Sequence, residues 1–240
     1  MSLCTSYGVG AYLPGEAHVA FVDDEFAARA GRPVTVLCHG ASMVAVSHLR
    51  PGWDAIPSAF ARAGLPVLGP DLGGPATWGN ETSIAAVDAA IAFAGPRYEL
   101  DTTRVVVVGT SMGSLVALNW ARRNRDRVGA VVLVIPVVSL AAQRTVADGR
   151  FVAPMEAAFG GPVGYLEKGP AADPFLSLPE LLGLPVSIWY SDNDPVIPIE
   201  PLAAMGEAIG AELHSVGPVL HALELIDPGP IVDWVLAALD

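Results

Sequence analysis

Short runs of consecutive apolar residues alternate along the chain with longer segments in which apolar residues recur every three or four positions. The apolar runs predict strands at residues 33–38, 65–70, 104–109, 129–135 and 185–190. Weaker runs predict two further strands, at residues 17–23 and 211–216. Apolar residues at consecutive positions are typical of strands that helices cover on both faces. The pattern therefore predicts a mostly parallel sheet of about seven to eight strands in a three-layer α/β fold.

The three- and four-residue spacing predicts the helices that cover this sheet. They are expected at residues 53–63, 83–94, 112–123, 199–209 and 231–239. Thr82 or Ser83 is the expected N-cap of the second helix, because a hydroxyl at that place can accept a bond from a free amide of the first turn.

Residues 136–183 depart from the alternation of strands and helices. The segment is rich in proline and glycine, contains FGGPVGYLEKGP and has no clear strand. A structureless loop of this length is uncommon inside a compact domain. We therefore expect a small, partly helical cap at residues 136–183, inserted in a single domain that spans residues 1–240.

Composition narrows the classes of protein and partner. A chain of 240 residues with 52% hydrophobic and 16% charged residues has enough apolar surface to fold as one domain. Its net charge of −12 disfavours nucleic acid and anionic lipid as partners. The sequence shows neither a signal peptide nor an apolar run of membrane-spanning length, so a cytoplasmic location is expected. Cys4 and Cys38 are not expected to form a disulfide, and no cysteine and histidine cluster predicts a metal site.

The segment RVVVVGTSMGSLVALNWARR places a Gly-x-Ser-x-Gly motif between a strand and a helix. A tight turn at that point would hold Ser111 in a strained backbone conformation and lift its hydroxyl clear of the strand ends. Gly109 and Gly113 have no side chain that would clash in such a turn. In this setting Ser111 is a candidate nucleophile rather than only a helix N-cap.

An acyl-transfer site also needs N–H donors for the oxyanion that forms on the attacked carbonyl. The strand at residues 33–38 runs into His39, Gly40 and Ala41, where the small residues allow a close turn. The backbone amides of Ala41 and Met112 are the expected oxyanion hole. His39 is expected to be structural.

A serine nucleophile needs a base, usually a histidine that a carboxylate holds. Of the five histidines, His221 is the candidate base, because it lies in a loop after the last strand and this loop opens at the same sheet edge as Ser111. Asp194 follows the strand at residues 185–190 and precedes His221 in the chain, which makes it the candidate acid. Asp192 is the alternative acid, and Asp71 is expected to be a turn residue.

Together these motifs resemble the α/β-hydrolase superfamily along nearly the whole chain. They are the strand with HGAS, GPDLGG, the strand with GTSMG and a helix, the strand with SDNDPVIP, and the late loop histidine. The resemblance implies an eight-stranded, mostly parallel sheet with an antiparallel strand near its start, and a cofactor-free triad. The sequence departs from the superfamily where Leu220, not glycine, precedes His221, and where His39-Gly40 is not followed by more glycines.

The leading hypothesis is a serine hydrolase, carboxylesterase-like, that cleaves a small-molecule acyl substrate without a cofactor. Acyltransferase, thioesterase, amidase, C–C hydrolase and cofactor-free haloperoxidase activities on the same triad stay open, and a non-catalytic ligand-binding homologue is the alternative of another class. The motifs do not predict the oligomeric state. Seven apolar side chains either line an apolar acyl pocket or belong to ordinary core and cap packing: Met43, Trp53, Trp78, Met155, Phe159, Tyr165 and Phe175.

Overall fold

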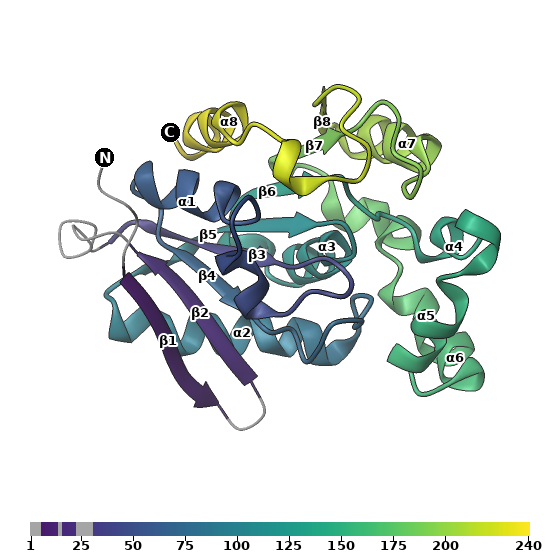
Figure 1. Ribbon diagram of the computed structural model, residues 1–240, viewed down its shortest axis with the longest axis horizontal. Helices are drawn as coiled ribbons and strands as arrows, with labels where there is room; N and C mark the ends of the chain where they lie inside the picture. Colours follow the sequence, from purple (N-terminus) through teal and green to yellow (C-terminus); the bar gives the residue numbers. More distant parts are fainter. Residues whose placement is uncertain (1–5, 14–15, 23–30) are drawn as a thin grey trace.

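A single eight-stranded sheet runs through the centre of the computed structural model, which describes residues 6–13, 16–22 and 31–240 (Figure 1). Its strand order is β1-β2-β4-β3-β5-β6-β7-β8. The strands are β1 (Ser6–Leu13), β2 (Glu16–Val22), β3 (Pro33–Cys38), β4 (Val67–Pro70), β5 (Asp101–Thr110), β6 (Val128–Val134), β7 (Val186–Tyr190) and β8 (Glu212–Ser215).

The strands β3 to β8 are parallel to one another, whereas β1 and β2 form an antiparallel pair and β2 runs antiparallel to β4. In the central strands, Val36 of β3 pairs with Val107 of β5, and Val107 pairs with Val131 of β6. All three valines are fully buried. The predicted three-layer, mostly parallel α/β fold is confirmed.

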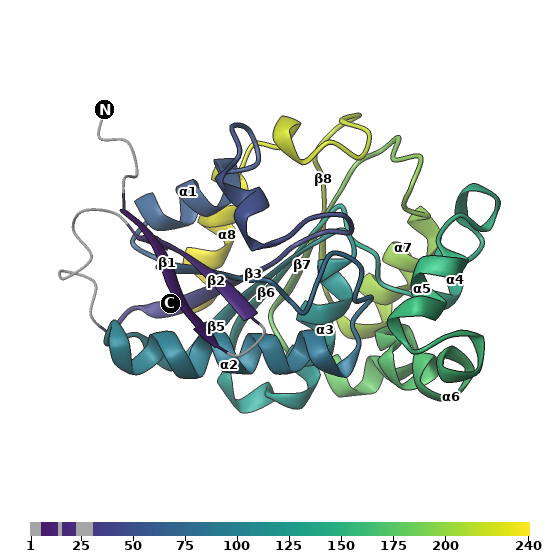
Figure 2. The ribbon, with the colours of Figure 1, turned by 60° about the horizontal axis from the view of Figure 1, so that its bottom comes forward.

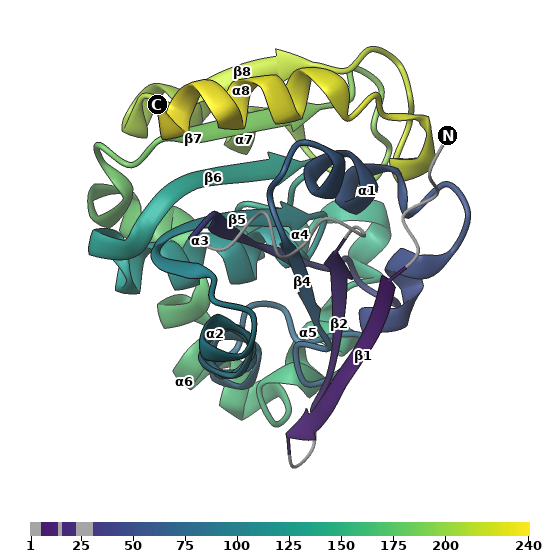
Figure 3. The same ribbon diagram turned by 90° about the vertical axis from the view of Figure 1, so that its left-hand side faces the viewer.

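Helices cover both faces of the sheet (Figures 1 and 3). They are α1 (Ala55–Arg62), α2 (Glu81–Arg97), α3 (Gly113–Arg123), α4 (Leu140–Gln143), α5 (Val152–Ala158), α6 (Pro162–Ala172), α7 (Ile199–Ile209) and α8 (Gly229–Leu239). One hydrophobic core joins the sheet to α2, α3, α7 and the segment between β6 and β7, and the other joins it to α1 and α8. No helix in the described part of the chain is long and apolar enough to cross a membrane.

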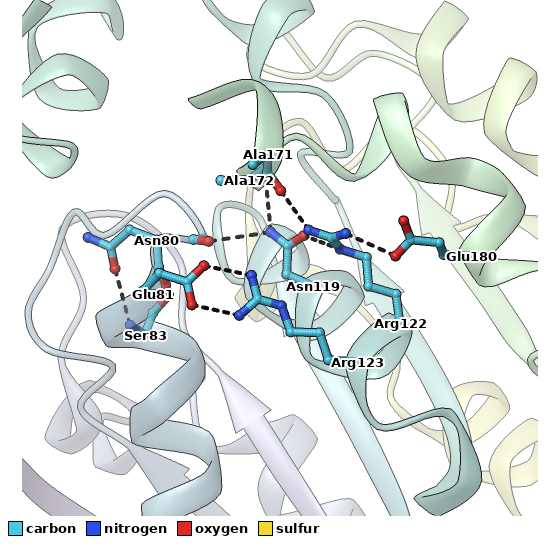
Figure 4. Close-up of polar contacts among 10 residues, drawn as sticks. Asn80, Glu81, Ser83, Asn119, Arg122, Arg123, Ala171, Ala172 and Glu180 are labelled. Atoms are coloured by element: carbon cyan, nitrogen blue, oxygen red, sulfur yellow. Dashed lines mark hydrogen bonds and ion pairs between the residues drawn. The ribbon is translucent and has the colours of Figure 1, made fainter. Parts of the chain in front are cut away.

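Residues 136–183 connect β6 to β7 through α4, α5, α6 and short 3-10 turns, and Figure 2 shows these helices together at one end of the molecule. Polar side chains from the main body bind their ends. Asn119 of α3 donates to the carbonyl of Ala172 (2.8 Å), and Arg122 donates to the carbonyl of Ala171 (2.6 Å; Figure 4). Asn80 donates to the carbonyl of Ala158 (2.9 Å). These bonds fasten the ends of α5 and α6 to the body that carries the sheet.

Two details differ from the sequence expectations. Strand β1 was not among the expected strands, because its glycines interrupt any apolar run. Helix α2 begins at Glu81, and Asn80 rather than Thr82 or Ser83 is its N-cap, with the Asn80 side chain accepting a bond from the amide of Ser83. Cys4 lies outside the described residues, and Cys38 is a buried free thiol whose pKa is raised by burial.

Candidate active site

The chain changes direction in the sheet between β3 and β5. From β3 it continues to β4 on one side, and β5 then pairs with the other side of β3. In open α/β sheets, ligands bind at the carboxyl ends of the strands that flank such a switch point. The loop that begins at His39 and the turn at Ser111 leave β3 and β5 at these ends. The topology therefore places both predicted site segments side by side.

Ser111 occupies the sharp turn between β5 and α3, with a left-handed backbone φ of 50°. A side chain on either flanking glycine would block this turn. A Cβ on Gly109 would lie 2.5 Å from the Cα of Ser114, and a Cβ on Gly113 would lie 2.1 Å from the carbonyl oxygen of Cys38. The turn is fixed because the amide of Ser111 donates to the carbonyl of Val134 (3.0 Å). The local sequence thus holds a serine hydroxyl at the edge of the sheet.

His221 and Asp194 form a continuous line of hydrogen bonds with this hydroxyl. Nε2 of His221 lies 3.0 Å from Oγ of Ser111, and Nδ1 of His221 lies 2.7 Å from Oδ2 of Asp194. The Asp194 side chain is only 4% exposed, whereas the His221 side chain is 24% exposed. The other carboxylate oxygen of Asp194 accepts bonds from the amides of Val196 (2.8 Å) and Ile197 (3.1 Å). This arrangement can take a proton from the serine and stabilise the resulting imidazolium.

The backbone amides of Ala41 and Met112 lie beside Ser111. Gly40 packs so closely that a Cβ there would be 3.3 Å from Cβ of Ser111, and Ala41 lines the same cavity as the serine. Within the described residues, neither amide donates a hydrogen bond to another protein group. Met112 is also the N-cap of α3, where the helix dipole favours negative charge. Both amides are thus free to bind an anionic oxygen.

The remaining candidate residues have other surroundings. The ring nitrogens of buried His39 lie 3.0 Å from the carbonyl oxygen of Gly40 and 3.1 Å from that of Asp71, so this side chain ties two loops together. Burial, with a smaller effect of the nearby His39, lowers the pKa of His48 to about 3. Asp192 accepts a bond from the hydroxyl of Ser215 (2.8 Å), which holds the loop between β7 and α7 against β8.

A cavity of about 150 Å³ opens at Ser111. Its apolar walls are Met43, Trp53, Ile135 and Leu223, and Glu224 lies beside Leu223 in the lining. Met43 and Trp53 were expected from the sequence. The walls formed by Ile135, Leu223 and Glu224 were missed, because a single apolar or acidic residue in a loop gives no periodic signal.

Five other side chains proposed as pocket walls do not line this cavity. Trp78, Met155 and Phe159 are buried in the larger hydrophobic core, and Tyr165 and Phe175 pack against that core. For these five side chains the alternative, ordinary packing in the core and in the insertion, is the correct one. Helices α5 and α6 pack on each other, η5 (Pro174–Leu181) packs on α3 and α7, and none of the residues 136–183 lines the cavity. Within the described residues, no cluster of three or more histidine, cysteine, aspartate or glutamate side chains is arranged to hold a metal ion.

Two family profiles match the chain, each over more than half of its length. One, described as the alpha/beta hydrolase fold, matches residues 33–159, and the other, described as serine hydrolase, matches residues 97–224. The chain therefore belongs to the α/β-hydrolase family and is a hydrolase of the serine-hydrolase type. No curated protein sequence matches it at a significant level.

Solved structures share the fold at low sequence identity. Est1E from Butyrivibrio proteoclasticus has a TM-score of 0.73 at 18% identity, with 98% of both chains covered. An S-formylglutathione hydrolase from Agrobacterium tumefaciens has a TM-score of 0.72 at 14% identity, covering 98% of this chain and 99% of its own. A ferulic acid esterase has a TM-score of 0.71 at 16% identity, covering 94% of this chain and 93% of its own. These likenesses establish the fold.

Proposed function

We propose that the chain hydrolyses a carboxylic ester of a small molecule through an acyl-enzyme on Ser111. The observation that carries this proposal is the line of hydrogen bonds from Asp194 through His221 to Ser111, beside a cavity. The esterases among the structures with the same fold agree with it.

In the first half of the reaction, Oγ of Ser111 attacks the acyl carbon while Nε2 of His221 takes the serine proton. The amides of Ala41 and Met112 hold the oxyanion, and Asp194 stabilises the imidazolium. Such a base typically contributes a factor of about 10² to 10⁴ in rate, and one oxyanion donor contributes about 3 kcal/mol. His221 then passes its proton to the oxygen of the leaving alcohol, which departs.

In the second half, a water molecule enters the place that the alcohol has left. His221 takes one proton from this water, whose oxygen attacks the acyl carbon and forms a second oxyanion in the same hole. Return of the proton to Oγ of Ser111 releases the carboxylic acid and restores the enzyme. No cofactor takes part in this proposed cycle.

The size of the cavity favours a short acyl group. Sites for drug-sized ligands usually have volumes of about 300–1,000 Å³, and the cavity at Ser111 has about 150 Å³. We also propose that residues 1–240 act as one domain in which residues 136–183 form a fixed helical insertion. The bonds from Asn80, Asn119 and Arg122 to its helix ends support a fixed attachment.

The test is hydrolysis of a series of p-nitrophenyl esters of rising acyl length by wild-type protein and by Ser111→Ala. We expect the highest kcat/KM with the short esters and no enzymatic turnover in the variant. Ser58→Ala is the matched control, because Ser58 lies in α1 and makes no side-chain hydrogen bond to the described residues. Unchanged turnover in folded Ser111→Ala would refute the proposal.

Two further measurements separate the alternatives. Labelling of Ser111 by a fluorophosphonate probe is expected, and its absence would favour a non-catalytic binding protein. Product analysis with an added alcohol distinguishes free acid from a new ester. Predominant formation of the new ester would favour an acyltransferase.

A further inference from the structure

One end of the cavity at Ser111 combines a carboxylate with an aromatic ring. Glu224 belongs to the 3-10 turn η6 (Leu223–Leu225), and Trp53 belongs to the turn that precedes α1. Both line the cavity. The two segments are in close contact, because a Cβ on Gly52 would lie 3.1 Å from Cβ of Glu224. Glu224 and Trp53 therefore belong to the same end of the cavity.

Glu224 brings a negative charge to this end of the cavity. Within the described residues, Glu224 takes part in no ion pair shorter than 4.0 Å. Charged side chains beside Trp53 include Arg50, whose guanidinium carbon lies 5.5 Å from the centre of the Trp53 ring, and Asp54, which accepts a bond from the amide of Gly52. Among these described residues, Glu224 and Asp54 are carboxylates and Arg50 is a cation, in a chain whose net charge is −12.

The proposed reaction indicates where the leaving alcohol lies in the cavity. The base His221 delivers its proton to the leaving alcohol, so the alcohol must lie on the His221 side of the serine. Glu224 follows His221 by only three residues, on the same loop, and lines the cavity with it. An alcohol that leaves toward His221 therefore approaches Glu224 and Trp53.

We propose that Glu224, with the face of Trp53, selects esters whose leaving alcohol carries a positive charge, such as an amino or quaternary ammonium alcohol. This inference rests on the proposed ester hydrolysis at Ser111. A carboxylate attracts a cation through its charge, and an indole attracts it through the negative face of its ring. The same groups would disfavour an anionic alcohol. Arg50 weakens the preference, because it supplies a competing cation at the Trp53 ring.

The test compares two butyrate esters of nearly the same shape. One has a trimethylammonioethyl alcohol, and the other has its uncharged isostere, in which carbon replaces nitrogen. At low ionic strength we expect wild-type kcat/KM to favour the cationic ester about 3- to 10-fold, which is the range expected for charges in a solvent-exposed site. The preference should fall as salt is added, because exposed charges are screened.

Variants then assign the preference to Glu224. The ratio of the two kcat/KM values should approach one in Glu224→Gln, persist in Glu224→Asp and reverse in Glu224→Lys. Glu167→Gln is the matched control, since it removes the same charge from an exposed position on α6 and should keep the wild-type ratio.

Three outcomes would overturn the inference. If wild-type protein hydrolyses the neutral ester but shows no preference, Glu224 does not select a cation and the proposed function stands. If the preference survives in Glu224→Gln, another group produces it. If neither ester nor any p-nitrophenyl ester is hydrolysed, the proposed function fails and this inference fails with it.

Discussion

Replacing Asp194 with asparagine should reduce ester hydrolysis by about 10⁴-fold, a larger effect than the loss of one charge alone would suggest. The reason lies in the different partners of the two carboxylate oxygens. Oδ1 accepts bonds from the amides of Val196 (2.8 Å) and Ile197 (3.1 Å), whereas Oδ2 lies 2.7 Å from Nδ1 of His221.

An asparagine side chain at this position can match its hydrogen-bond partners in only one orientation. Two N–H donors face the place of Oδ1, so the amide oxygen stays there and the amide nitrogen turns toward His221. Nδ1 of His221 must then accept a bond, which places the ring proton on Nε2. Nε2 faces Oγ of Ser111 at 3.0 Å and, in this tautomer, has no lone pair to receive the serine proton.

The magnitude follows from the loss of general-base catalysis. The same exchange in a serine-protease triad lowers kcat by about 10⁴-fold through the wrong tautomer. At 1.36 kcal/mol per factor of ten, this corresponds to about 5 kcal/mol in the activation barrier. The fold should survive, because the two backbone amides keep an oxygen acceptor.

The assay is kcat/KM for a short p-nitrophenyl ester, measured together with the urea midpoint of unfolding. Asp192→Asn is the matched control, because it makes the same chemical change two residues earlier, where the carboxylate accepts only from Ser215 among the described residues. That variant should keep most of its activity. Retention of more than about a tenth of wild-type kcat/KM by Asp194→Asn would refute the tautomer argument. Loss of activity in Asp192→Asn alone would assign the acid to Asp192.

Substitutions at three other residues test the supporting structure. Asn119→Leu should lower the free energy of unfolding by roughly 2–4 kcal/mol in urea titrations, because this buried amide bonds the carbonyls of Gly79 and Ala172 and accepts from Arg122; an unchanged midpoint would contradict this reading. Asn193→Ala should lower kcat about 10-fold with a smaller change in KM, because Asn193 accepts a bond from the amide of Leu220 (3.1 Å) and so positions His221, and Asn193→Asp should recover part of the loss. Burial raises the pKa of Asp173 above its ordinary value of 3.8, so the protonated carboxyl favours the folded state. The free energy of unfolding of wild type relative to Asp173→Asn should therefore fall as the pH rises from 3.8 through the raised pKa. Urea unfolding at several pH values measures this difference, and a constant difference would count against it.

Much of the sheet could be predicted because strands that are buried on both faces have consecutive apolar residues. The central strands carry consecutive valines, and each predicted strand among them overlaps an observed one. Strand β1 has no such run of apolar residues. It pairs only with β2, at the edge of the sheet, and its sequence SYGVGAYL contains two glycines. Its pairing with β2, rather than an apolar run of its own, is what the structure shows holding this strand.

The three polar residues of the candidate site could be selected because a parallel sheet limits where they can be. Every loop that follows a parallel strand opens at the same edge, so only residues in such loops compete for the positions beside Ser111. This reasoning selected His221 after β8 and Asp194 after β7, and the structure places both within hydrogen-bonding distance of their partners. Their catalytic roles stay predictions until the variants are measured.

The walls of the cavity could not be predicted by the same reasoning. Trp53 and Glu224 lie far apart in the sequence, and they meet because α1 and η6 both pack in the smaller hydrophobic core, through Ile56 and Leu223. No periodic pattern in the sequence predicts that two such turns will lie in contact. The groups that carry out the proposed chemistry are therefore fixed by strand order, whereas those proposed to choose the substrate are fixed by helix packing. Substitutions in the turns could consequently change which ester is preferred while the line from Asp194 to Ser111 stays in place.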